Sequence, residues 1–254
     1  MHLQRSPEDA VAWCWLARVK LKGEEHAEIE EDIRGGPTDA DASYWRGRIC
    51  DADGNTAEAA VAFKACIESD PDYLQAYTWY VGTCCRMARA QKEELGLKFA
   101  IEYLKSAETG AMDGISHAIS LRDGPMLAEL QTTACMIKND LAYAYAEGKR
   151  ADWLTEAEAK AREAVEMSDK YGLSPSLRAA CRDTLAYVKL CREALEEIPN
   201  GQALQAAEDL LEKAVKLLGP AELQGPQERA IQRHIREHMG LLETLRMEMQ
   251  AEDE

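Results

Sequence analysis

The segment between Tyr44 and Tyr73 is the part of the sequence that most narrows the choice of folds. It holds two runs of helix-forming residues, which are separated by the turn dipeptide Asp53-Gly54 and ended by Asp70-Pro71. This unit of helix, turn, helix and stop spans 30 residues, close to the period of about 34 residues at which helix pairs repeat in stacked architectures. The segment therefore predicts one unit of a repeated helix pair, and not a lone amphipathic helix.

Four residues of this unit predict that its two helices pack closely. Gly47 has no side chain and lets the second helix approach, and Phe63 on that helix fills the space between them. Ala59 and Cys66 are small residues on the same face as Phe63. In these residues the segment resembles a tetratricopeptide (TPR) repeat across its whole length. The resemblance implies an α-solenoid of stacked antiparallel helix pairs that forms a right-handed superhelix.

Further helix pairs resemble this unit less closely and bring the expected number to about five degenerate repeats. They lie around Trp13 and Leu16, around Tyr77 with 100–107, at 139–148 with 157–166, and at 184–187 with 207–217. A last amphipathic helix, at about 227–250, resembles the cap that covers the end of a solenoid. Since no stretch alternates apolar and polar residues for long, we expect an all-α chain.

The breaks between these segments predict the domain organisation. Residues 1–109 form TPR-like repeats 1–3, 110–125 form an irregular connection rich in glycine, 126–218 form repeats 4–5, and 219–254 form a capping helix with an acidic tail.

Charge and hydropathy exclude several classes of function. The chain has 46 acidic and 30 basic residues and a formal net charge of -16, which repels phosphate backbones and anionic membrane surfaces. No apolar run is long enough to span a membrane, and the first residues lack the pattern of a secretory signal. We therefore expect a cytoplasmic protein that binds neither nucleic acid nor membranes.

The eight cysteines show no C-x-x-C pair and no spacing suited to zinc. We expect most of them to be small buried side chains in a reducing compartment. Cys84 and Cys85 are adjacent, but neighbouring side chains on a helix point about 100° apart, which disfavours a redox pair.

The clearest enzyme-like pattern is HIREH at 234–238, which has the H-x-x-E-H spacing of a family of zinc peptidases. That chemistry needs a third ligand and a closed pocket, and a terminal capping helix favours two partly exposed histidines, His234 and His238, instead. The calcium-like DADGN at 51–55 has its glycine too early and is better explained as a turn. Since no phosphate-binding or nucleophile motif is present either, we expect no catalysis, no metal and no cofactor.

The TPR resemblance implies that the first helix of each pair lines a concave groove, which in that family usually holds an extended peptide or a helix of another protein. The side chains that the register directs into this groove are basic, polar or aromatic. They are Arg18, Lys22, Tyr44, Arg48, Asp51, Arg86, Asn139, Tyr143 and Tyr187, with Gln75, Thr78, Met136 and Asp183 as further inward positions. The arginines suit a partner with carboxylates, and the tyrosines offer flat contact surface. The alternative is that the basic residues only balance acids along the same helices.

We therefore predict a non-catalytic scaffold or adaptor that binds a partner peptide or helix, including an acidic one, in the groove. The carboxylate clamp of chaperone-binding TPR proteins is not expected, because Cys14 and Tyr44 occupy positions where it needs lysine or asparagine. An alternative is a regulatory protein that senses a ligand or peptide by hinge motion about 110–125. Self-association through the terminal helix is also compatible with the sequence.

Overall fold

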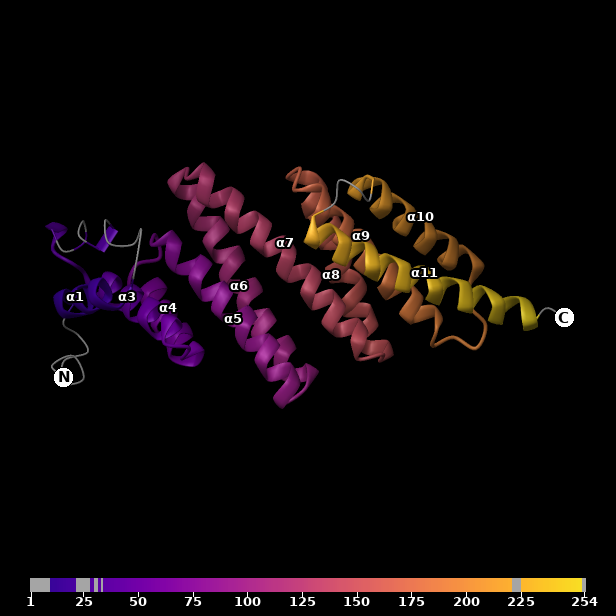
Figure 1. Cartoon of the computed structure of the whole chain (residues 1–254), viewed down its shortest axis with the longest axis horizontal. Coiled ribbons are helices and arrows are strands. Elements are labelled where there is room, and N and C mark those ends of the chain that lie inside the picture. Colours follow the sequence, from indigo (N-terminus) through magenta and orange to yellow (C-terminus); the bar gives the residue numbers. More distant parts are fainter. Residues whose placement is uncertain (1–9, 22–27, 30–31, 33, 221–224, 253–254) are drawn as a thin grey trace. The chain divides into compact units, whose positions relative to one another are not determined.

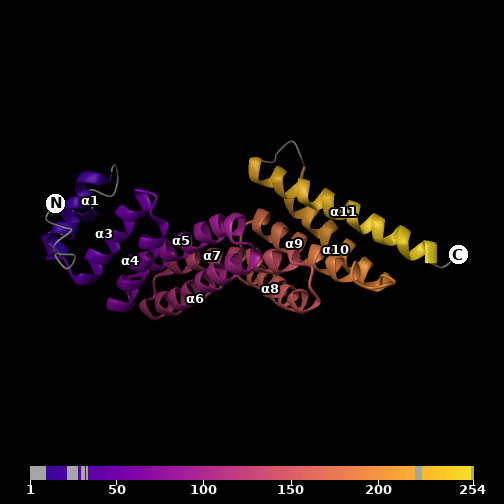
Figure 2. The ribbon, with the colours of Figure 1, turned by 90° about the horizontal axis from the view of Figure 1, so that it is seen from below.

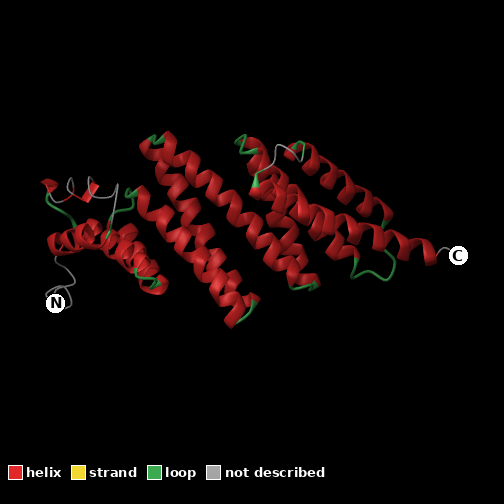
Figure 3. Cartoon of the chain, in the orientation of Figure 1, coloured by secondary structure: helices red, strands yellow, loops and turns green. Residues whose placement is uncertain are grey.

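The computed structural model of the chain describes residues 10–21, 28–29, 32, 34–220 and 225–252. Within these ranges all regular secondary structure is helical, and Figure 3 shows no strand among them. Consecutive helices pack against each other, most extensively α5 on α6, α9 on α10 and α3 on α4. The predicted all-α class and the stacking of neighbouring helices into a solenoid are confirmed.

The chain divides into two compact units, residues 1–130 and 131–254. The helices of the first unit are α1 (Ala10–Lys20), α3 (Asp39–Ala52), α4 (Thr56–Ser69), α5 (Leu74–Glu94) and α6 (Leu97–Leu121) (Figure 1). Helix α7 (Gly124–Glu147) begins in the first unit and continues into the second. The second unit also contains α8 (Ala151–Lys170), α9 (Pro175–Glu193), α10 (Gly201–Leu218) and α11 (Pro226–Glu252).

Local sequence explains why α3 and α4 form a tight pair. Thr38 caps α3 in a capping box with Asp41, and the side chain of Asn55 caps α4. Gly54 in the turn has a φ of 79°, a left-handed conformation that favours glycine. A Cβ on Gly47 would lie only 2.6 Å from Cε1 of Phe63, so the close approach predicted for these two residues is present.

The segment 110–125 differs from its prediction as an irregular connection. Helix α6 continues through Gly110 and Gly114 to Leu121, and only a short turn at Arg122, which has a φ of 58°, precedes α7. A Cβ at Gly110 would lie 2.9 Å from the Tyr80 ring, and one at Gly114 would lie 3.0 Å from Tyr77. These glycines therefore permit close packing of α6 on α5 and do not break the helix, so the segment proposed as a hinge is mostly helical.

Helix α11 packs against α9 and α10 within the second unit, as Figure 2 also shows. Its apolar side chains Ile235, Leu242 and Leu245 are 1–3% exposed and join a core with residues of those two helices, such as Leu190, Leu204 and Leu211. The helix predicted at 227–250 lies inside α11. No helix within the described residues is both long and apolar enough to cross a membrane.

Candidate binding surfaces

In the first unit, Arg48 of α3 lies against Trp79 of α5. Its Cζ atom is 3.7 Å from the centroid of the Trp79 ring, and its Nη1 donates a hydrogen bond of 3.2 Å to Oη of Tyr44. Only 8% of Arg48 is exposed. A guanidinium group held on an aromatic face in this way is attracted to the ring and fixed in position. Arg48 therefore joins two helices of the unit.

Tyr44 lies inside the core of the first unit and is 1% exposed. Its ring packs against those of Trp45 and Tyr73, each at a centroid distance of 4.9 Å, and against Phe63 at 6.0 Å. Burial raises the pKa of Tyr44 to about 12, although Arg48 acts in the opposite direction. The aromatic surface that the sequence predicts at Tyr44 is thus used for internal packing.

Further along the same helices, Arg86 of α5 forms an ion pair with Asp51 of α3. Nη2 of Arg86 also donates to Oγ1 of Thr83 at 3.1 Å, and 45% of the Arg86 side chain is exposed. Lys20 of α1 forms an ion pair with Asp53 at the end of α3. Arg86 and Asp51 therefore meet through a contact between α5 and α3, and not along one helix as the alternative interpretation of balanced charges expects.

Helix α1 carries an exposed apolar stripe, which we define as Val11, Trp15 and Val19. These side chains are 47%, 46% and 80% exposed and follow each other at intervals of four residues. The guanidinium of Arg18 lies 5.3 Å from the centroid of the Trp15 ring. Lys22, the other basic residue predicted here, lies outside the described residues.

In the second unit, the predicted residues Tyr143 of α7 and Tyr187 of α9 come together and stack at a centroid distance of 5.2 Å. Burial raises the pKa of both phenols, so both are neutral at physiological pH. Asn139 lies one turn before Tyr143, and its buried Oδ1 has no hydrogen-bond partner. Of the other inward positions, Asp183 is 5% exposed and Met136 is 46% exposed.

Helix α11 covers this pair of tyrosines. The ring of His238 stacks on Tyr187 at 4.5 Å, and its Nδ1 lies 2.7 Å from Oδ1 of Asp183. His234 lies 6.5 Å from the ring of Tyr143. Both histidines of the HIREH motif therefore contact residues of α7 or α9, and no group of three metal-binding side chains occurs in the described part of the chain.

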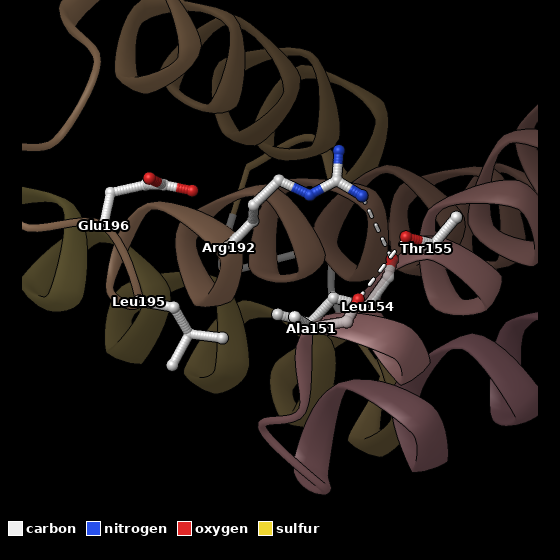
Figure 4. A pocket seen from close by; sticks show the side chains of 6 residues that line it. All are labelled: Ala151, Leu154, Thr155, Arg192, Leu195 and Glu196. Atoms are coloured by element: carbon white, nitrogen blue, oxygen red, sulfur yellow. Dashed lines mark hydrogen bonds between the residues drawn. The ribbon is translucent and has the colours of Figure 1, made fainter.

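A pocket lies between the first turn of α8 and the end of α9 (Figure 4). Its lining residues are Ala151, Leu154, Thr155, Arg192, Leu195 and Glu196. Arg192 forms an ion pair with Glu158 of α8 and donates a long hydrogen bond of 3.5 Å to the carbonyl oxygen of Leu154. The guanidinium group of Arg192, which lines this pocket, is thus already bound to other residues of the protein.

Glu158 is the centre of a charge cluster that joins α8 to α9. Besides Arg192 it contacts Arg162, and Nζ of Lys189 is 3.7 Å from its Oε1. Burial raises the pKa of Glu158, but the hydrogen bond from Arg162 and the charges of Arg192, Lys189 and Arg162 outweigh this effect and hold the pKa below 4.5.

The predicted set of site residues did not include Trp15 or Trp79. Asp183 was a predicted inward position, but its contact with His238 was not predicted. Trp79 follows the predicted inward positions Gln75 and Thr78, so a shift of one residue in the register would have included it. His238 and Asp183 are 55 positions apart, so no local sequence pattern could predict their contact. No protein-family model matches the sequence, and no curated protein matches it either.

Proposed function

We propose that this protein is a non-catalytic scaffold that binds a segment of a partner protein on the first helices of its TPR-like pairs. The binding site is the unit 1 face, which we define by Trp15 and Arg18 on α1 and by Trp79 and Arg86 on α5. This face lies in the groove that the TPR resemblance implies, but it excludes Tyr44 and Arg48, which are only 1% and 8% exposed.

The proposal rests on the position of α11 in the second unit. There, Tyr143 and Tyr187, two residues expected to face the groove, contact an amphipathic helix of the same chain through His234 and His238. The same helix buries Ile235, Leu242 and Leu245 against α9 and α10. This contact supports the proposal that first helices of this kind bind a partner helix, which is one of the recurring modes of peptide recognition.

Like the surface that Tyr143 and Tyr187 form, the unit 1 face presents aromatic and polar side chains to a partner. Trp15 is half-exposed, and the Arg86 side chain is 45% exposed while Asp51 holds it in place. Tryptophan and arginine are the residue types that most often dominate binding energy at protein interfaces, and pre-positioned side chains lose less entropy on binding. The partner segment that suits this face carries an apolar side chain for Trp15 and a carboxylate for Arg86.

A photo-crosslinking amino acid placed at Trp15 or Arg86, in native cells, tests the proposal directly. Both positions are expected to crosslink to one and the same partner protein. The matched control is Val61 on α4, which is 67% exposed and lies on a second helix. Crosslinks of equal yield from all three positions, or none from Trp15 and Arg86, would contradict the assignment.

A second experiment measures affinity once that partner is known. Trp15→Ala is expected to weaken binding by about tenfold or more, which corresponds to about 1.4 kcal/mol. Val61→Ala removes a similarly exposed apolar side chain and is expected to leave affinity unchanged. Circular dichroism of both variants checks that the helices are intact.

A further inference from the structure

Two cysteines of the second unit lie close together inside a small core between α7, α8 and α9. Sγ of Cys135 is 3.7 Å from Sγ of Cys181, and both residues are 0% exposed. Cys135 and Cys181 are 46 positions apart in the sequence and belong to different helices, α7 and α9. Their proximity is therefore a product of the tertiary fold.

The hydrogen bonds around this pair give its two thiols different roles. Cys135 donates to the carbonyl oxygen of Ala164 at 3.4 Å, which leaves Cys181 to donate to Sγ of Cys135. A thiolate is stabilised when it accepts a hydrogen bond, and this contact lowers the pKa of Cys135 against the opposing effect of burial. The pKa of Cys181 is raised, first by its hydrogen bond with Cys135 and then by burial. Cys135 is therefore the more acidic thiol and the better nucleophile of the two.

We propose that Cys135 and Cys181 are an oxidation site, at which peroxide converts the two thiols into a disulfide that links α7 to α9. The geometry permits the bond because the two sulfur atoms are already in contact. A disulfide requires a sulfur–sulfur separation of about 2.0 Å, so small rotations of the two side chains must close the remaining gap.

The reaction balances with hydrogen peroxide as the oxidant. The thiolate of Cys135 attacks one peroxide oxygen, an S–O bond forms, and the O–O bond breaks to release hydroxide, which takes up the proton lost by the thiol. The sulfur of Cys181 then attacks the sulfenic sulfur of Cys135. The S–S bond forms as the S–O bond breaks, and the proton of Cys181 leaves with the departing hydroxide as a second water. The two thiols together supply the two electrons that reduce the peroxide.

Burial of the two thiols slows this oxidation. Because neither thiol reaches the surface, peroxide must enter through a local opening of the second unit, which makes the reaction slower than that of a surface cysteine. Once formed, the bond closes a loop that contains all of α8. A cross-link of this kind restricts the unfolded chain and is expected to raise the melting temperature.

Peptide mapping tests the proposal on the intact folded protein. The protein is incubated with hydrogen peroxide, free thiols are blocked with N-ethylmaleimide, and tryptic peptides are analysed by mass spectrometry. Cys135 and Cys181 lie alone on the tryptic peptides 123–138 and 179–182. We expect a cross-linked species of these two peptides that dithiothreitol separates.

Variants and a second readout make the test specific. Cys135→Ser and Cys181→Ser should each abolish the cross-linked species, whereas Cys191→Ser, a change at another buried cysteine of α9, should retain it. The oxidised wild-type protein should melt at a higher temperature than the reduced protein, and dithiothreitol should reverse the rise. If peroxide leaves both thiols free, or links either of them mainly to another cysteine while circular dichroism shows a folded protein, the proposal is wrong.

Discussion

At the scale of single residues, the basic side chains of the first unit hold helices together as well as presenting charge. Arg48 lies on the Trp79 ring, and Arg86 is paired with Asp51. A charge reversal at Arg48 would therefore remove a packed side chain of the core and would confuse lost stability with lost binding. Trp15 and Arg86 are better probes of the unit 1 face because their side chains are substantially exposed.

Gly47→Ala is expected to destabilise the protein by about 1–3 kcal/mol, because the new methyl group would lie within 2.9 Å of three atoms of the Phe63 ring in a closely packed core. Thermal and urea unfolding measure the change. The matched control is Gly240→Ala on α11, where nothing lies within 4 Å of the added Cβ. That variant should gain about 0.5–1 kcal/mol from helix propensity. Equal effects at the two positions would contradict the packing account.

The contact of Gly47 with Phe63 could be predicted from the sequence because both residues lie in one short repeat with strong turn signals on either side. Gly110 and Gly114 show the limit of the same reasoning. Glycine disfavours a helix by about 1 kcal/mol, and this local preference predicts a break. Packing of α6 on Tyr77 and Tyr80 overrides it, because the ring positions depend on a different helix.

At the scale of helices, α8 and α9 are joined by the cluster of Arg162, Lys189 and Arg192 around Glu158. Only 13% of the Glu158 side chain is exposed, while the side chains of Arg162 and Arg192 are 58% and 40% exposed. Charges that remain this accessible are screened by water, so the cluster contributes modestly to stability. Because the cluster is centred on the carboxylate of Glu158, this contact between α8 and α9 is sensitive to acid.

This contact predicts a pH dependence. The pKa of Glu158 in the folded protein lies below its ordinary value of 4.5, so the stability it contributes is present above pH 4.5 and is lost as the pH falls through the folded value. Glu158→Gln should lower the free energy of unfolding by about 1 kcal/mol or less at pH 7. The difference from the wild type should shrink as the pH falls below 4.5.

Urea unfolding at several pH values measures this dependence, and Glu156→Gln, a change at an exposed residue of the same helix, is the control. A difference between Glu158→Gln and the wild type that stays constant down to acidic pH would show that the cluster does not act through the charge of Glu158.

At the scale of the whole molecule, the chain consists of two compact units, and α11 completes the second. The amphipathic pattern of α11 could be predicted from the sequence, as could its place at the end of the chain. Its contacts with Tyr143 and Tyr187 could not, because they depend on how far the helix reaches along α9 towards α7. The stacking of these tyrosines with histidines requires the folded second unit.

A variant that ends at Leu218, and so lacks α11, tests the division into units. Amide hydrogens of α9 and α10 should exchange faster in this variant, because Leu204 and Leu211 lose the apolar cover of Ile235, Leu242 and Leu245. The exchange of α3, α4 and α5 in the first unit should stay the same. A control substitution at Met247, which is 63% exposed on α11, should change neither unit. Faster exchange throughout the chain would contradict two separate units.

The division into units also determines what intrinsic fluorescence can report. Four of the five tryptophans, Trp13, Trp15, Trp45 and Trp79, belong to the first unit, and Trp153 alone belongs to the second. Tryptophan emission during unfolding therefore follows mainly the first unit, whereas far-ultraviolet circular dichroism follows the helices of both. Two transitions at different urea concentrations would show that the units unfold independently, and coincident transitions would show that they unfold as one cooperative system. The uneven distribution of tryptophan thus lets its intrinsic emission report mainly on the first unit.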